Sequence, residues 1–165
     1  MDRPITPELD QFVEDMALRY EDEGFPPMAG RLAGWLLVCD PPWQTASELA
    51  DVLGASPGSI STMTRMLIQC GLVERVAVPG QRTAAFQMKT GAAREVMAGW
   101  QTKTTKMRDL LRRGLGLLEG QSDERRQRIL EQLDFHEFIE RALPELLSGW
   151  DRRVQEKEKE GETDE

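Results

Sequence analysis

The stretch from residue 45 to residue 88 constrains the fold of this chain more than any other. A short amphipathic helix is predicted over residues 47–53, and the small residues 54–56 form a tight link to a second helix. Ser56 suits the N-cap of that second helix, and Pro57 suits its first helical position. Two helices joined by so short a link are typical of a helix-turn-helix.

The residues after the second helix change to a strand pattern. Residues 73–78 alternate in strand fashion, Pro79-Gly80 supplies a turn, and residues 83–88 return. Together with the two helices, this hairpin predicts a winged helix-turn-helix within a mainly α (α+β) fold, in which the hairpin is the wing.

Helical periodicity assigns two faces to the second helix. Its core side is predicted to be Ile60, Met63, Thr64 and Leu67, and its outer side Gly58, Ser61, Thr62, Arg65 and Gln69. Small residues at a helix start allow close approach to DNA, and Ser, Thr, Gln and Arg donate to phosphates or base edges. An ordinary solvated helix face is the alternative. The candidate DNA-binding residues are Ser56, Gly58, Ser59, Ser61, Thr62, Arg65, Gln69, Gln81, Arg82 and Thr83.

Two further helices are predicted before this module. The first follows the cap Thr6-Pro7-Glu8 and carries an apolar stripe opposite an acidic face, and Gly24 ends it. The second, residues 28–39, is apolar almost all round apart from Arg31 and should be a core helix. Gly30 and Gly34 lie on one of its faces, where they either allow close contact with another backbone or are incidental.

Two long helices are predicted after the module. The first, residues 91–119, has a basic outer face that is either a second DNA-facing surface or the partner of the acidic first helix, and we expect the second. The next helix begins after Ser122, and Pro144 should kink or split it. From Asp151 the apolar residues run out, so residues 151–165 should fray into solvent.

The predicted helices outside residues 45–90 carry more apolar side chains along their faces than a module of forty-odd residues can cover, which predicts self-association. We therefore divide the chain into N-terminal helices for dimerisation and core (1–44), a winged helix-turn-helix DNA-binding domain (45–90), C-terminal dimerisation helices (91–150) and a charged tail (151–165). A two-fold dimer would place two recognition helices about one DNA turn apart, roughly 34 Å.

A net charge of −8 for the whole chain argues against DNA binding, but the acidic residues are concentrated at its two ends. Residues 1–25 hold two basic and eight acidic residues, and residues 151–165 hold four basic and seven acidic ones, whereas residues 45–90 balance at +1. Attraction to phosphate depends on the local field rather than on total charge. We expect salt-sensitive binding that relies on two copies.

Five segments of the chain carry a family resemblance when taken together. They are Gly24-Phe25-Pro26-Pro27, Gly30-Arg31-Leu32-Ala33-Gly34, Ser47-Glu48-Leu49-Ala50, Ser56-Pro57-Gly58-Ser59-Ile60-Ser61, and Leu67 with Gly71-Leu72-Val73-Glu74-Arg75. The combination resembles the GbsR-like branch of the MarR-type transcriptional regulators over about residues 6–150.

The resemblance implies a homodimeric winged-helix repressor, with the recognition helix in the major groove and the wing tip, Gln81-Arg82-Thr83, beside the minor groove or backbone. Many such wings carry several basic residues near the tip, whereas this one has Arg82, with Arg75 at its base. Members of this group often respond to small molecules held between the winged domain and the dimer helices.

Aromatic side chains are the candidates for an effector site, because aromatic faces attract cations such as quaternary ammonium groups. Trp43, which we place in a loop, ranks first, followed by Trp35 and Trp100; core packing is the alternative for each. Cys39 and Cys70 lie in apolar helical contexts and are expected to be reduced, buried thiols.

Metal and catalytic readings are weak. His136 with Glu140 offers at most two ligands, and no nucleophile motif or Gly-rich phosphate loop is present, so we expect no metal, no cofactor and no enzyme activity. The chain has no long apolar run or leader segment, which favours a cytoplasmic protein without membrane contact. Two hypotheses remain: a dimeric regulator that binds double-stranded operator DNA, and a winged-helix module that binds protein.

Overall fold

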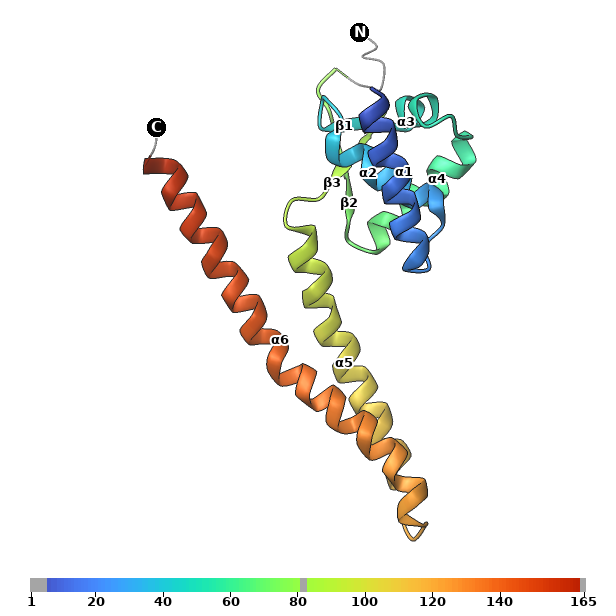
Figure 1. The fold of residues 1–165 in the computed structure, drawn as a ribbon, viewed down its shortest axis with the longest axis vertical. Coiled ribbons are helices and arrows are strands. Elements are labelled where there is room, and N and C mark those ends of the chain that lie inside the picture. The colour runs from blue at the N-terminus through green and yellow to red at the C-terminus, as the bar shows by residue number, and fades with distance from the viewer. Residues whose placement is uncertain (1–5, 81–82, 164–165) are drawn as a thin grey trace. The chain divides into compact units, whose positions relative to one another are not determined.

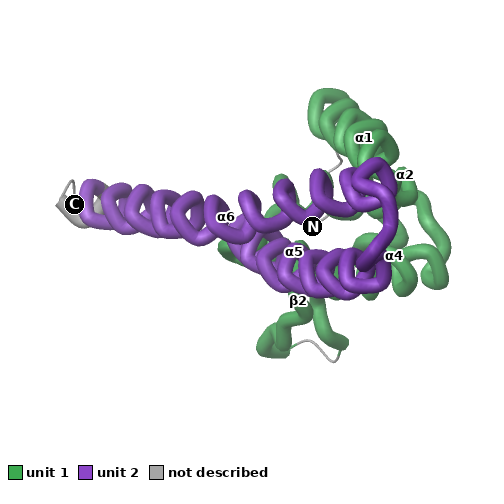
Figure 2. The backbone as a smooth tube through the Cα atoms, turned by 90° about the horizontal axis from the view of Figure 1, so that it is seen from below, with its two compact units in different colours: residues 1–92 green, residues 93–165 purple. Residues whose placement is uncertain are grey.

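The computed structural model describes residues 6–80 and 83–163, which form two compact units meeting between Ala92 and Ala93 (Figure 2). The first unit contains four helices and three short strands (Figure 1). In chain order they are α1 (Pro7–Asp22), α2 (Pro27–Val38), β1 (Trp43–Thr45), α3 (Ala46–Val52), α4 (Pro57–Gln69), β2 (Val73–Val76) and β3 (Ala85–Met88). The second unit is a pair of long helices, α5 (Ala92–Gly116) and α6 (Asp123–Thr163).

Side-chain caps fix where three helices of the first unit begin. The Thr6 hydroxyl accepts from the Leu9 N–H at the start of α1, and Ser56 does the same for α4. Thr45 forms a capping box with Glu48: its hydroxyl accepts from the Glu48 N–H, and the Glu48 carboxylate accepts from the Thr45 N–H at 2.7 Å. The predicted caps of α1 and α4 are therefore correct.

The strands form an antiparallel sheet in the order β1-β3-β2. In the wing hairpin Val73 lies opposite Met88 and Val76 opposite Ala85, so both strands are shorter than predicted. The sequence did not predict β1. Trp43 was expected to lie in a loop before the helix predicted over residues 47–53, but residues 43–45 pair with the outer edge of β3, with Trp43 opposite Gln87.

The core of the first unit joins α2 to the helix-turn-helix and the wing. Its fully buried members are Ala29, Leu32, Ala33, Leu49, Ile60 and Leu67, with Val73 from β2 almost completely buried. The prediction of a core helix over residues 28–39 is thus confirmed, because five apolar side chains and two glycines between residues 29 and 39 are buried.

Gly30 and Gly34 are not incidental, because α1 packs against them. A Cβ atom on Gly30 would lie 2.5 Å from the Met16 carbonyl oxygen and 2.7 Å from the Ala17 Cα, and one on Gly34 would lie 3.0 Å from the Met16 Cβ. Beside this contact, Arg31 forms an ion pair with Glu14 of α1 at 2.7 Å. The two glycines let the α1 and α2 backbones approach closely, and α1 buries Val13 and Ala17 there.

The second unit overturns one of the two alternatives predicted for Pro144, a kink or a split of the last helix. The helix is not split, because α6 is continuous from Asp123 to Thr163 with Pro144 inside it. The Ser148 hydroxyl donates to the Pro144 carbonyl at 2.8 Å, one turn further on. Residues 151–163 were expected to fray but continue the same helix. Residues 155–160 are all Gln, Glu or Lys, which are strong helix formers even without apolar residues among them.

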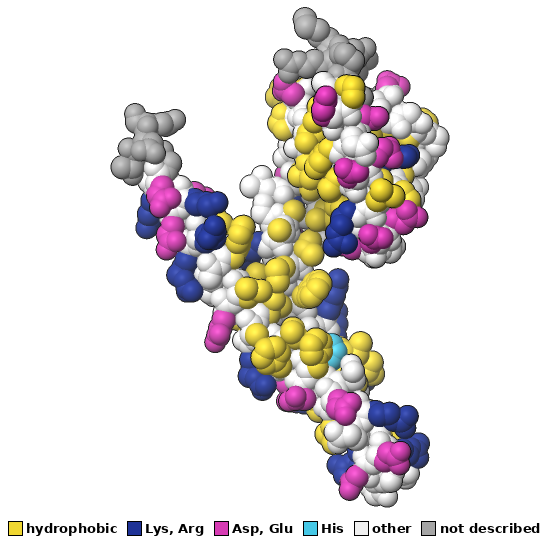
Figure 3. Space-filling model, in the orientation of Figure 1, with side chains coloured by type: hydrophobic (Ala, Val, Ile, Leu, Met, Phe, Trp, Pro, Cys, Tyr) yellow, Lys and Arg dark blue, Asp and Glu magenta, His cyan; other side chains and the backbone are white. Residues whose placement is uncertain are grey.

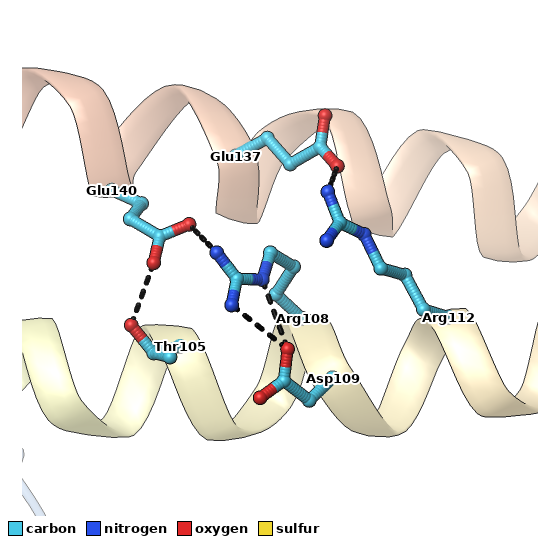
Figure 4. A network of polar contacts seen from close by, with 6 residues as sticks. All are labelled: Thr105, Arg108, Asp109, Arg112, Glu137 and Glu140. Atoms are coloured by element: carbon cyan, nitrogen blue, oxygen red, sulfur yellow. Dashed lines mark hydrogen bonds and ion pairs between the residues drawn. The ribbon is translucent and has the colours of Figure 1, made fainter.

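The basic face of α5 also has a different partner from the one expected. Arg94 forms a two-pronged ion pair with Asp151. Arg112 binds Glu137 at 2.7 Å, and Arg108 binds Glu140 (Figure 4). These three arginines therefore bind α6 rather than the acidic first helix. Glu140 also accepts from the Thr105 hydroxyl at 2.7 Å. Charge complementarity predicted a partner helix correctly but named the wrong one.

Candidate nucleic-acid interface

The turn between α3 and α4 sets how the second helix is presented. Gly54 has a φ of +58°, a left-handed conformation that glycine adopts without strain, and the Ala55 N–H donates back to the Ala50 carbonyl at 2.9 Å. Ser56 then caps α4. Four residues, 53–56, therefore join the two helices, so the link is short, as predicted.

The structure confirms the predicted inner face of α4. The buried residues of this helix are Ile60, Met63, Thr64 and Leu67. Leu49 of α3 belongs to the same buried cluster. This packing fixes the rotation of α4 about its axis and so determines which side chains face outward.

Six of the candidate residues lie on the exposed face of α4 and at its N-cap: Ser56, Gly58, Ser61, Thr62, Arg65 and Gln69. Ser59 is different, because it is half-buried and its N–H donates to the Ser56 hydroxyl at 3.2 Å. The exposed row runs from small residues at the amino end to long polar ones at the carboxyl end. Such a row can approach a groove and donate to phosphates and bases.

Two details near the start of α4 limit what its side chains can do. The Thr62 hydroxyl donates to the Gly58 carbonyl at 2.9 Å, so its proton is already used within the helix. A Cβ atom on Gly58 would find only the Ser56 Oγ within 4 Å, at 4.0 Å. The surface over Gly58 is therefore open.

The wing contributes less to the described interface. Thr83 is exposed just before β3, whereas the candidates Gln81 and Arg82 lie outside the described residues. At the base of the wing Arg75 is exposed on β2, opposite Phe86. Arg65 and Arg75 are thus the exposed cations of the described helix-turn-helix and β2.

The three tryptophan candidates have different surroundings. Trp43 starts β1 instead of lying in a loop and is half-buried, and Trp35 is half-buried against the core of the first unit. The Trp35 indole N–H is buried with no hydrogen-bond acceptor among the described residues. Trp100 belongs to the second unit, where it is 54% exposed on α5.

The two cysteines and the single histidine are the remaining side chains that could be reactive or bind a metal. Cys39 is buried, and burial raises the pKa of its thiol to about 11; Cys70 is only half-buried, so the prediction of two buried thiols is correct for Cys39 alone. Glu140, the expected neighbour of His136, is engaged by Thr105 and Arg108. Among residues 6–80 and 83–163 no group of three metal-ligating side chains is found.

Thr45 has two structural roles that the sequence analysis did not predict. Thr45 ends β1, lies opposite Ala85 of the wing, and caps α3. The spacing of Thr45 and Glu48 is a capping-box pattern, which would have located this start of α3 one residue earlier than predicted.

The arrangement of α3, α4 and the three-stranded sheet defines a winged helix-turn-helix protein with an exposed polar face on its second helix. A family model described as an MmpR5-like MarR family transcriptional regulator matches residues 91–153, which form most of the second unit. The HTH-type transcriptional regulator MmpR5 of Mycobacterium tuberculosis (strain ATCC 25618 / H37Rv) is 39% identical over 153 residues, 91% of each chain. A crystal structure of a transcriptional regulator has 37% identity and a TM-score of 0.79, covering 88% of this chain and 99% of that one.

The chain therefore belongs to the MarR family of transcriptional regulators. It is a DNA-binding regulator, and the alternative of a protein-binding module is not favoured. Its relatives are regulators and not enzymes. In the part of the chain that the structure describes, every helix is too short or too polar to span a bilayer.

Proposed function

We propose that this regulator is a homodimeric repressor that inserts α4 into the major groove of its operator and rests its wing beside the minor groove or the DNA backbone. The observation that supports this most directly is the exposed face of α4, where Gly58 leaves the helix surface open and Ser61, Thr62, Arg65 and Gln69 follow along one side. In this arrangement Ser56 and Ser61 donate hydrogen bonds to phosphates, and Arg65 and Gln69 donate hydrogen bonds to base edges. The finer assignment to the GbsR-like branch, which rests on the Gly30–Gly34 segment, is part of the same proposal.

The proposed dimer rests on the apolar residues of the second unit. Nine large apolar side chains of α5, α6 and their connection are exposed within the single chain, and hydrophobic side chains gather along both helices (Figure 3). They are Trp100, Met107, Leu110, Leu117, Leu130, Phe135, Phe138, Leu146 and Trp150. Apolar surface of this extent marks an interaction site. We assign it to a second copy of the chain, with the N-terminal helices completing the interface.

We also propose that a small-molecule effector modulates binding, with Trp43 and Trp35 as its candidate contacts and Trp100 as a contact from the dimer helices. The unpartnered indole N–H of Trp35 supports a ligand that offers a hydrogen-bond acceptor. Titration of the tryptophan fluorescence with a quaternary ammonium compound that also carries a carboxylate, and so offers both a cation and a hydrogen-bond acceptor, should show saturable quenching in the wild type and less in Trp43→Phe. Quenching that is equal in both proteins would remove Trp43 from the proposal.

The DNA contact is tested by measuring affinity for the chain's own promoter and for random DNA over a salt series. Log affinity should fall steeply against log salt, because phosphate contacts release counterions. Arg65→Ala should weaken promoter binding by about 5- to 150-fold, since a good base contact is worth about 1–3 kcal/mol. Adding Arg82→Ala should abolish binding.

Arg128→Ala is the matched control, because Arg128 is an exposed arginine on α6 and is not among the proposed DNA contacts on α4 and the wing. It should leave promoter affinity within about twofold of the wild type, as expected for a surface change away from the contact. Equal affinities of the wild type and the Arg65/Arg82 double variant would show that α4 and the wing are not the DNA contacts.

The dimer is tested by sedimentation of the full chain carrying Phe138→Ser, whose side chain is exposed on α6 in the single chain. The dissociation constant of the dimer should rise by about tenfold or more, because removing a large aromatic side chain from the centre of an interface costs about 1.4 kcal/mol of binding free energy or more. A wild-type chain that sediments as a monomer at micromolar concentration would reject the dimer.

A further inference from the structure

We propose that Thr62 reads DNA sequence through its γ-methyl group, by contacting the 5-methyl group of a thymine next to the base that Arg65 contacts. The inference rests on the proposed placement of α4 in the major groove. It goes beyond that placement because it assigns one atom of the protein, Cγ2 of Thr62, to one chemical group of the operator.

The hydrogen bond of Thr62 supplies the first step. Its hydroxyl donates to the Gly58 carbonyl at 2.9 Å, one turn back along the helix. The hydroxyl and methyl groups leave Cβ in different directions, so when Oγ1 turns back toward Gly58 the methyl group is left to meet whatever lies outside. Thr62 thus presents an apolar group on an otherwise polar exposed row.

The surroundings of Thr62 supply the second step. Gly58, one turn earlier, has no side chain, and nothing but the Ser56 Oγ lies within 4 Å of where one would be. Arg65 follows three residues later on the same exposed side. Neighbouring residues of this row therefore leave the Thr62 methyl accessible to a base edge.

The chemistry of the major groove supplies the third step. Thymine alone among the four bases places a methyl group there, and a threonine methyl is a matching apolar contact. Guanine, which arginine contacts through O6 and N7, presents only acceptors on its edge. Because the Thr62 hydroxyl proton is already engaged, a hydrogen bond donated by Thr62 would first have to break the bond to Gly58.

Thr64 shows that a hydrogen bond from the threonine hydroxyl to the helix backbone does not by itself make the methyl group available to DNA. Its hydroxyl donates to the Ile60 carbonyl at 2.8 Å in the same manner, but Thr64 is buried on the inner face of α4. The two threonines share their internal hydrogen bond and differ in what their methyl groups can reach.

The test uses the full chain and an operator chosen by selection from random DNA. Each thymine of one half-site is replaced in turn by deoxyuridine, which removes only the 5-methyl group, and affinity is measured for the wild type, Thr62→Ser and Thr62→Val. Wild type should lose about fourfold at one thymine, the value of one buried carbon group of about 0.8 kcal/mol. Thr62→Ser, which keeps the hydroxyl, should lose this discrimination, and Thr62→Val, which keeps a methyl, should retain it.

The outcomes separate this inference from the proposed function. If Arg65→Ala weakens binding but Thr62→Ser still discriminates thymine from deoxyuridine as the wild type does, the methyl contact is wrong and the placement of α4 stands. The same conclusion follows if no thymine of the half-site shows a methyl effect, or if Thr62→Val and not Thr62→Ser loses it. If Arg65→Ala leaves affinity unchanged, the placement of α4 itself fails and the inference fails with it.

Discussion

The two units bury their apolar residues in opposite ways. In the first unit the apolar faces of α2 and α4 close on one another, and Leu32, Leu49, Ile60 and Leu67 are completely buried. In the second unit only Leu143 and Leu147 are buried among the large apolar residues described, while the contacts between α5 and α6 include the polar residues Thr105, Arg108 and Glu140. The core of the first unit closes within one chain, whereas the second unit exposes most of its large apolar side chains, which another molecule would cover.

The largest expected effect comes from equal truncations in the two units. Leu32→Ala should lower the free energy of unfolding by about 2–5 kcal/mol, because it leaves a cavity in a closed core. Leu110→Ala, at a side chain that is 53% exposed, should act only through association. Denaturant unfolding at several protein concentrations separates the two: the loss in Leu32→Ala should be independent of concentration, and the loss in Leu110→Ala should vanish on dilution. A large loss in dilute Leu110→Ala would break the comparison.

A second pair uses the same substitution and should give opposite signs. Gly30→Ala should destabilise the chain by about 1–3 kcal/mol, because the new Cβ would overlap the backbone of α1. Gly99→Ala, in the middle of α5 with nothing within 4 Å of the new atom, should stabilise it by about 0.5–1 kcal/mol through helix propensity. Thermal unfolding of both variants gives the measurement. Equal signs would mean that α1 does not press against Gly30.

The polar contacts of the second unit should show in the pH dependence of stability. The hydrogen bond from Thr105 and the guanidinium of Arg108 hold the pKa of Glu140 below its ordinary value. A lowered carboxyl pKa contributes stability that is present above the unfolded-state value of about 4.3 and is lost as the pH falls through the folded-state value. Glu140→Gln should therefore be less stable than the wild type at neutral pH and lose less stability on acidification.

Glu145→Gln is the control for this effect, because Glu145 is an exposed carboxylate on the same helix. Its acid unfolding curve, followed by circular dichroism, should overlay that of the wild type. Overlaid curves for Glu140→Gln and the wild type would show that the contacts of Glu140 with Thr105 and Arg108 contribute nothing to the stability of the folded state.

The first unit was the more predictable of the two because its signals are local. Caps at Thr6 and Ser56, the short link around Gly54, and a 3.6-residue period fix the helices and their faces, so the inner face of α4 was predicted residue by residue. Strand β1 was missed because three residues after two prolines are too few to show an alternating pattern. Its pairing with β3 joins residues about forty positions apart, which no local pattern reports.

The second unit was harder because its signals are charges. The sequence shows that Arg94, Arg108 and Arg112 lie on one helix, but several acidic helices could pair with them, and in the structure all three pair with α6. Pro144 was predicted to kink or split the helix because proline removes one backbone hydrogen bond, yet the helix formers on both sides keep the helix from splitting there. The outer face of α4 was predicted as a surface, but the hydrogen bond that orients Thr62 required coordinates.

Thr45 closes the last residue pair of β1 against the wing strand and, in the same residue, holds the first turn of α3. Thr45 thus links the wing sheet directly to the helix-turn-helix. In the proposed DNA complex, a tilt of the wing would pass through this residue to the start of α3, so the contacts made by α4 and by the wing would depend on one another.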